Sequence, residues 1–148
     1  MFLWFILPFS EADVDIKPLC DLVRQTAYDI HTYLGCGHLE KVYENALLHR
    51  LQKLGLRAEQ QHPIRVFDED GTPIGDYYAD LLIEEVLLLE LKAVKNLAPE
   101  HDAQILGYLK AARFEHGMLI NFGSQKFEVR KFIRTSNSPQ SIERPQNN

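Results

Sequence analysis

The feature that most constrains the fold is an apolar run over residues 86–94 that only Glu90 and Lys92 interrupt. A run of this kind is typical of a strand in the centre of a sheet, with other layers covering both of its faces. The two charged residues are two positions apart, so their side chains leave the same face of such a strand. Because burying an unpaired charge is costly, the run predicts either a Glu–Lys ion pair near the sheet edge or a functional site.

Helices and further strands are predicted on both sides of this central run. Turn-forming residues at 68–71 and the pair at 84–85 separate the first three strands, which therefore form a meander. The expected fold class is α/β, with a mixed central sheet of four to five strands flanked by helices. The predicted elements are, in order, helices over 19–34 and 39–54, strands over 64–67, 74–83 and 86–94, a helix beginning at Pro99, and strands over 117–122 and 127–133.

The length of 148 residues predicts one domain. Residues 1–17 are expected to form an apolar and then acidic extension, residues 18–134 the domain, and residues 135–148 a disordered polar tail. The apolar start is too short for a transmembrane helix and lacks the charge and cleavage site of a secretory signal, so no membrane association is expected. Two cysteines cannot form a disulfide framework and fit the reducing cytoplasm.

Composition excludes several classes of function and leaves a local basic flank. The balance of 16 basic against 21 acidic residues gives a net charge of −5, so the surface as a whole is not built to attract polyanions. Glycine-rich nucleotide-binding motifs and paired CxxC zinc motifs are absent from the sequence. Residues 104–134 nevertheless hold six basic residues against two acidic ones, which suits a phosphate backbone, although charges also commonly protect an edge strand. The candidates for nucleic-acid binding are Lys126, Arg130, Lys131 and Arg134.

Asp80 adds a second carboxylate to the central pair. If residues 84–85 form the turn between two strands, Asp80 lies roughly opposite Glu90. Paired carboxylates supply hard oxygen ligands for Mg²⁺ or Mn²⁺, and such an ion acidifies a bound water and polarises a phosphoryl oxygen. Lys92 beside the ion can hold the attacking water or neutralise charge on the scissile phosphate. Together the three residues predict a metal site for phosphodiester hydrolysis.

The order of these residues resembles the PD-(D/E)XK nuclease superfamily, in which an aspartate precedes a Glu-x-Lys strand and follows a helix bearing glutamates. Residues 37–43 (GHLEKVY) also match the GxxExxY signature of one small family within that superfamily. The resemblance implies a restriction-endonuclease-like core and extends over most of the chain. Its other matching segments are YENAL at 43–47, YADLL at 78–82, ELKAV at 90–94, AQILGYLK at 103–110 and LINFG at 119–123.

Further candidate site residues lie on the predicted helix over 39–54 and on the predicted helix that begins at Pro99. Glu40 and Glu44 are four positions apart and share one helix face. The resemblance implies that one of them approaches the metal: Glu40 is the signature residue, and Glu44 stands where related resolvases place theirs. Solvent-facing glutamates are the alternative. The resemblance also implies that Gln104 supports the metal or a phosphate, and the alternative is a polar cap on the sheet edge. Tyr43 is expected in the core.

The leading hypothesis is a Mg²⁺-dependent (or Mn²⁺-dependent) nuclease that hydrolyses phosphodiester bonds of DNA or RNA. Asp80 and Glu90 hold the ion in this hypothesis, Lys92 assists the water, and Gln104 with a helix glutamate completes the site. The rival hypothesis is a catalytically inactive nucleic-acid- or protein-binding module that retains the nuclease fold, and the net acidic charge keeps it open. The oligomeric state is also open, with a homodimer as one alternative.

Overall fold

The computed structural model describes residues 15–135, so most of the predicted N-terminal extension and nearly all of the polar tail lie outside the described residues. The first helix begins two residues before the predicted domain boundary. No helix among the described residues is long and apolar enough to cross a membrane. The elements are α1 (Ile16–Leu34), α2 (Glu40–Lys53), β1 (Ala58–Phe67), β2 (Pro73–Ile83), β3 (Leu87–Lys92), α3 (Pro99–Ala112), β4 (His116–Asn121) and β5 (Glu128–Ile133).

The five strands form one mixed sheet in the order β1-β2-β3-β4-β5. The first three strands form an antiparallel meander, β3 and β4 run parallel, and β5 pairs antiparallel with β4 at the edge. The mixed sheet and the meander are therefore confirmed. α3 supplies the crossover that a parallel pair of strands requires. β1 begins at Ala58, six residues earlier than predicted. The prediction misses this first half of the strand because it is polar and lacks the alternating apolar pattern that marks a strand.

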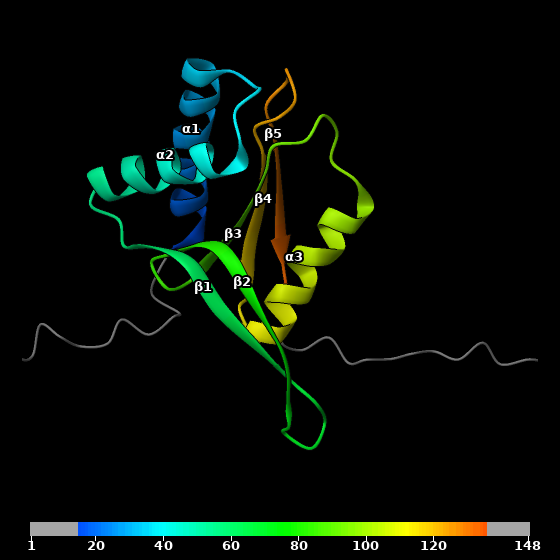
Figure 1. Ribbon diagram of the computed structural model, residues 1–148. Coiled ribbons are helices and arrows are strands. Elements are labelled where there is room, and N and C mark those ends of the chain that lie inside the picture. Colours follow the sequence, from blue (N-terminus) through cyan, green and yellow to red (C-terminus); the bar gives the residue numbers. More distant parts are fainter. Residues whose placement is uncertain (1–14, 136–148) are drawn as a thin grey trace, which may run out of the picture.

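Helices cover both faces of the sheet. α1 and α2 lie against one face and α3 lies against the other (Figure 1). Leu87, Leu89 and Leu91 of β3 pack with α1 and α2, whereas Leu88 packs with Ile105 of α3. The strand is thus buried on both sides, as its apolar sequence predicts.

The end of β3 is fastened to the end of β4. The backbone N–H of Phe122 donates to the carbonyl of Lys92 at 2.8 Å. The Asn121 side chain accepts a hydrogen bond from Val94 N at 3.1 Å and donates one to Val94 O at 2.9 Å. Gly123 permits this close approach, because a Cβ there would lie 2.3 Å from Val94 N. The backbone of residues 92–94, at the end of β3 and directly after it, is therefore fixed by hydrogen bonds to the end of β4.

Gly123→Ala should destabilise the protein by about 1–3 kcal/mol, because the added methyl group forces apart two backbones in contact. The matched control is Gly107→Ala in α3, where an added Cβ meets nothing within 4 Å. That change should stabilise the protein by about 0.5–1 kcal/mol through the helix preference for alanine. Urea denaturation measures both free energies of unfolding. Equal stability of the two variants would contradict the packing described for Gly123.

Candidate active site

β2 and β3 are linked through side chains at the point where the two carboxylates lie. Backbone pairing between the strands reaches Leu81 and Leu89, one step before Asp80 and Glu90. From there, Glu90 Oε1 accepts a hydrogen bond from the backbone N–H of Asp80 at 3.1 Å. Asp80 Oδ2 accepts one from the backbone N–H of Leu91 at 2.8 Å. Each carboxylate thus takes the place of a backbone carbonyl in the ladder, and the two are held side by side.

At Asp80 the inward-facing side chains of the β1–β2 hairpin change from one face of the sheet to the other. Leu81 packs with α1 and α2, whereas Ala79, two residues earlier, packs with α3. An undistorted strand would place both on one face. The register between the strands passes over Gln61 and Asp80, and Gln61 has a left-handed φ of 53°. This irregularity accompanies the turn of the Asp80 carboxylate toward β3.

Glu44 joins α2 to this irregular point of the hairpin. Its side chain is buried and pairs with Lys41 of its own helix. Gln60 and Gln61 each donate a side-chain N–H to Glu44 at 2.8 Å. The Gln61 amide also reaches Asp80 Oδ1, in a long contact of 3.5 Å. The sequence pattern does not mark the two glutamines as site residues, because the predicted strand begins after them; two adjacent polar residues beside a strand are the one signal of their role.

Glu40 is the first residue of α2 and is exposed. It lies within electrostatic reach of Asp80, Lys92 and Glu44, which together with Glu90 form the charge cluster of the site. Partial burial of its carboxyl group raises the pKa of Glu40, and the negative charge of Asp80 raises it further. The positive charge of Lys92 acts in the opposite direction. Both candidate helix glutamates therefore lie in this cluster, but Glu44 is buried among hydrogen-bond donors whereas Glu40 is accessible.

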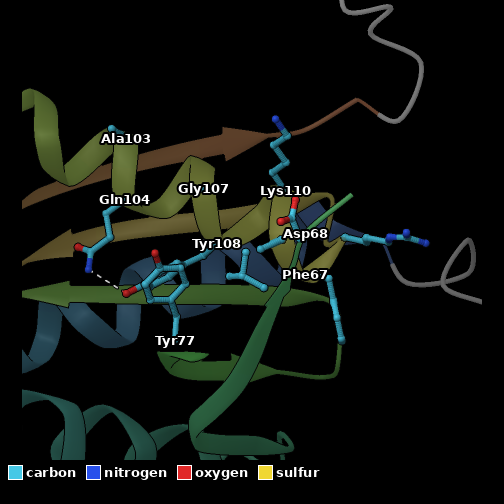
Figure 2. A pocket seen from close by; sticks show the side chains of 11 residues that line it. Phe67, Asp68, Tyr77, Ala103, Gln104, Gly107, Tyr108 and Lys110 are labelled. Carbon is cyan, nitrogen blue, oxygen red and sulfur yellow. Dashed lines mark hydrogen bonds between the residues drawn. The ribbon is translucent and has the colours of Figure 1, made fainter. Parts of the chain in front are cut away.

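α3 supplies the partner of the strand lysine. Lys92 Nζ donates a hydrogen bond to Gln104 Oε1 at 2.8 Å. The Gln104 amide in turn donates to the hydroxyl of Tyr108 at 2.9 Å (Figure 2). Gln104 is thus connected to the carboxylate pair through Lys92, whose ammonium group it orients. Tyr108 was not predicted as part of the site, although it shares a helix face with Gln104.

Burial makes the carboxylate pair difficult to ionise. Glu90 is only 3% exposed, and desolvation followed by the negative charge of Asp80 raises its pKa to about 8. The pKa of Asp80 is also raised, mainly by desolvation and further by Glu44, while its bond from Leu91 N and the charge of Lys92 lower it. Carboxylates held this close titrate as a unit rather than independently. The patch therefore resists full ionisation, and a bound cation would favour the ionised form of both carboxyl groups.

The carboxylate pair suits a hard divalent cation. Among residues 15–135, no three His, Cys, Asp or Glu side chains are already arranged as a complete metal site. A complete protein cage is not required, however, because Mg²⁺ is usually bound through one or two carboxylates and keeps several waters. Asp80 and Glu90 offer two such carboxylates, each oriented by a backbone N–H. These are the residues that could hold the ion.

The predicted basic flank is divided between the two faces of β5. Arg130 pairs with Asp102 of α3, with 2.7 Å between Nη1 and Oδ2. The next residue, Lys131, approaches the buried cysteine of α1 on the opposite face. Arg134 donates to a backbone carbonyl after α3, and Lys126 is exposed before the strand. The structure does not bring these four side chains together on one face.

Comparisons with known proteins agree with this architecture. A family profile described as the PD-(D/E)XK nuclease superfamily matches residues 17–132. The crystal structure of SSO0001 is similar in fold, with a TM-score of 0.53 and 18% sequence identity over 64% of this chain and 50% of that chain. This chain therefore spans about half the length of that protein. A search of curated protein sequences finds no match. The five-stranded mixed sheet flanked by three helices is consistent with the predicted restriction-endonuclease-like fold.

The metal-free protein should lose stability as the pH rises from about 5 to about 8. The folded protein retains a proton on Glu90 up to a pKa of about 8, whereas the unfolded chain releases it near the ordinary value of 4.5. The folded state binds more protons between these values, so the free energy of unfolding falls with pH, by at most about 1.4 kcal/mol per pH unit. Urea denaturation in EDTA measures the slope. Glu90→Gln should remove most of it, and an unchanged slope in that variant would contradict the raised pKa.

Asp80→Asn should leave the metal-free protein at least as stable as wild type. The substitution removes repulsion with Glu90, and the amide oxygen can still accept the bond from Leu91 N. Asp80→Ala should cost about 1–3 kcal/mol, because that N–H then loses its acceptor. Denaturant melts in EDTA compare the two variants. Equal destabilisation by both would indicate instead that the Asp80 charge is part of a structural ion pair with Lys92.

Proposed function

Since this chain belongs to the PD-(D/E)XK nuclease superfamily, we propose that it is a metal-dependent nuclease that hydrolyses phosphodiester bonds of DNA or RNA. Nucleases of this superfamily generally use divalent metals and act on nucleic acid. The observation that carries the proposal is the convergence of Asp80, Glu90 and Lys92 on one patch where two strands separate. A purely structural ion pair of Glu90 with Lys92 would not need a second, half-buried carboxylate beside it.

Asp80 and Glu90 are the proposed ligands of Mg²⁺ or Mn²⁺. When bound, such an ion supplies a more acidic water and polarises a phosphoryl oxygen. The bonds from Leu91 N and Asp80 N fix the two carboxylates before any ion arrives, so neither has to be ordered on binding. The raised pKa values of both groups show that the fold disfavours their joint ionisation, which a bound cation would reverse, and this supports a cation site here.

Lys92 is the proposed contact for the attacking water and the scissile phosphate. A lysine ammonium has three N–H donors, so the bond to Gln104 orients it while leaving donors for a water and a phosphate oxygen. Its positive charge offsets the negative charge that grows on the phosphate in the transition state. Gln104 acts through Lys92 in this proposal and is a positioning residue.

Glu40 and Glu44 have different proposed roles. Glu44 holds Gln61, which borders Asp80, and is therefore a positioning residue at the point where the hairpin is irregular. Glu40 is accessible at the start of α2 and within the electrostatic reach of Asp80 and Lys92. We assign to Glu40 the contact with a metal-bound water or with the substrate.

We also propose that the chain is a member of the GxxExxY family. Each signature residue has a physical role that supports this assignment. Gly37 adopts a left-handed φ of 110° before α2, which favours glycine. Glu40 lies in the charge cluster. Tyr43 is fully buried, stacks on Phe122 with ring centroids 4.7 Å apart, and donates its hydroxyl to Gly35 O at 2.6 Å. The tyrosine thus anchors the start of α2, from which Glu40 projects.

Lys92→Ala should lower turnover by about 100- to 10,000-fold while nucleic-acid and Mn²⁺ binding change little, because the contribution of the lysine is greatest in the transition state. Cleavage is measured with Mn²⁺ on single-stranded, duplex and branched DNA and RNA. Lys95→Ala, at an exposed lysine in the following loop, is the matched control and should retain wild-type turnover. Asp80→Ala should abolish Mn²⁺ binding in a calorimetric titration.

Two results would contradict the nuclease proposal. Binding of nucleic acid without cleavage, together with no Mn²⁺ binding at millimolar concentrations, would favour the catalytically inactive binding module. Cleavage that survives in both Lys92→Ala and Asp80→Ala would show that the activity lies elsewhere in the preparation.

A further inference from the structure

A groove of about 690 Å³ opens beside the site, between α3 and the outer part of the β1–β2 hairpin (Figure 2). Its volume lies in the range of pockets that hold small organic molecules. Tyr77 of β2 and Tyr108 of α3 meet in the groove, with ring centroids 5.3 Å apart. Neither the carboxylate pair nor the strand lysine lines this space, so the proposed chemistry leaves the groove without a role.

The groove is linked to the proposed active site through Gln104. Gln104 and Tyr108 line it, and the same Gln104 holds the ammonium of Lys92 at 2.8 Å. The hydroxyl of Tyr108 accepts the Gln104 amide at 2.9 Å. A chain of three side chains therefore runs from the strand lysine into the groove. A nucleic-acid strand whose phosphate lies at Lys92 has this groove as its neighbouring surface.

The two tyrosines differ in accessibility. Tyr108 is 9% exposed, whereas Tyr77 is 50% exposed. Tyr108 therefore supports the Tyr77 ring and remains covered, and Tyr77 presents much of its ring to the solvent. Aromatic rings on which a base can stack are the common device for holding single-stranded nucleic acid, and every base offers a face for such stacking.

Charge in the groove suits a phosphate backbone. Lys110 and Arg113, near the C-terminal end of α3, line the groove, and Asp68 at the hairpin turn is its acidic member. Basic side chains beside a stacking ring are the combination that single-strand-binding surfaces use. Gly107 lies three residues before Lys110 on α3, and a Cβ at this position would meet nothing within 4 Å, so the space above the helix is open there.

We propose that this groove binds an unpaired nucleotide of the substrate strand, with its base stacked on Tyr77 and its phosphates near Lys110 and Arg113. This inference rests on the proposed nuclease function and specifies its substrate. A base inside a duplex is already stacked on both neighbours and cannot also stack on a protein ring. The substrate is therefore single-stranded, or it carries an unpaired nucleotide next to the bond that is cleaved.

The test compares two tyrosines on one strand. Tyr77→Ala removes the stacking ring. The matched control is Tyr78→Ala: Tyr78 is 55% exposed, close to the 50% of Tyr77, but its side chain leaves the opposite face of the strand. Tyr77→Phe keeps the ring without the hydroxyl. All three substitutions are made in the Lys92→Ala background, so that the probe stays intact in the presence of Mn²⁺.

The probes are DNA and RNA oligonucleotides that carry one 2-aminopurine, whose fluorescence falls when its base stacks. Titration of the single strand should quench the fluorescence, and Tyr77→Ala should abolish the quench and weaken binding by about 5- to 150-fold. Tyr77→Phe and Tyr78→Ala should behave like the parent protein. Blunt duplexes should bind more weakly than single strands, and the DNA and RNA arms show which sugar the groove accepts.

A second variant tests the groove itself. Gly107→Leu places a side chain in the open space and should weaken binding of the single strand without lowering the thermal melting temperature. Equal effects of Tyr77→Ala and Tyr78→Ala, or equal affinity for duplex and single strand, would overturn the inference. If those results came with Lys92-dependent cleavage, the nuclease function would stand and only the groove assignment would fail. If no nucleic acid bound at all, both would fail.

Discussion

Two carboxylates brought together on the buried strands of the sheet are the constraint around which the rest of the molecule is arranged. Asp80 and Glu90 replace backbone carbonyls in the ladder between β2 and β3, so each is held by an N–H of the strands themselves. Those bonds offset part of the cost of burial and the ammonium of Lys92 offsets a further, smaller part, yet the pKa of Glu90 still reaches about 8. The fold thus holds at a fixed place two carboxyl groups that do not both ionise easily, and a bound cation would favour the ionised form of each.

The irregular point of the hairpin has two consequences for the proposed site. At Gln61 and Asp80 the strands exchange the faces that they present, with the core of α1 and α2 on one side of this point and α3 on the other. The exchange accompanies the turn of the Asp80 carboxylate toward β3. It also places Tyr77 over α3, where it borders the groove. A residue such as Gln61, in a left-handed conformation that side chains disfavour, is kept because hydrogen bonds to Glu44 and Asp80 hold it there.

The two helical layers position different side chains of the proposed site. α2 lies on one face and brings Glu40 and Glu44 to the hairpin, whereas α3 lies on the other and brings Gln104 to Lys92 (Figure 1). The site forms where the strands separate, because there the side chains of both layers can approach the same pair of carboxylates. The side chain of Asn121, at the end of β4, bonds to the backbone of Val94 and so holds the segment that follows β3 between the two layers.

The order of the elements, the buried central strand and the pairing of Asp80 with Glu90 were available from the sequence, because apolar period and turn chemistry are local properties of the chain. The roles of Gln61 and Tyr108 and the division of the basic residues between two faces were not. They depend on the interruption of strand pairing at Gln61 and Asp80, on which helix covers which face, and on distances between residues far apart along the chain. Local sequence patterns therefore determined which charged side chains lie on the central strands. Only the tertiary structure decided which other side chains contact them, because those contacts join residues that are far apart in the chain and meet only when the helices pack on the sheet.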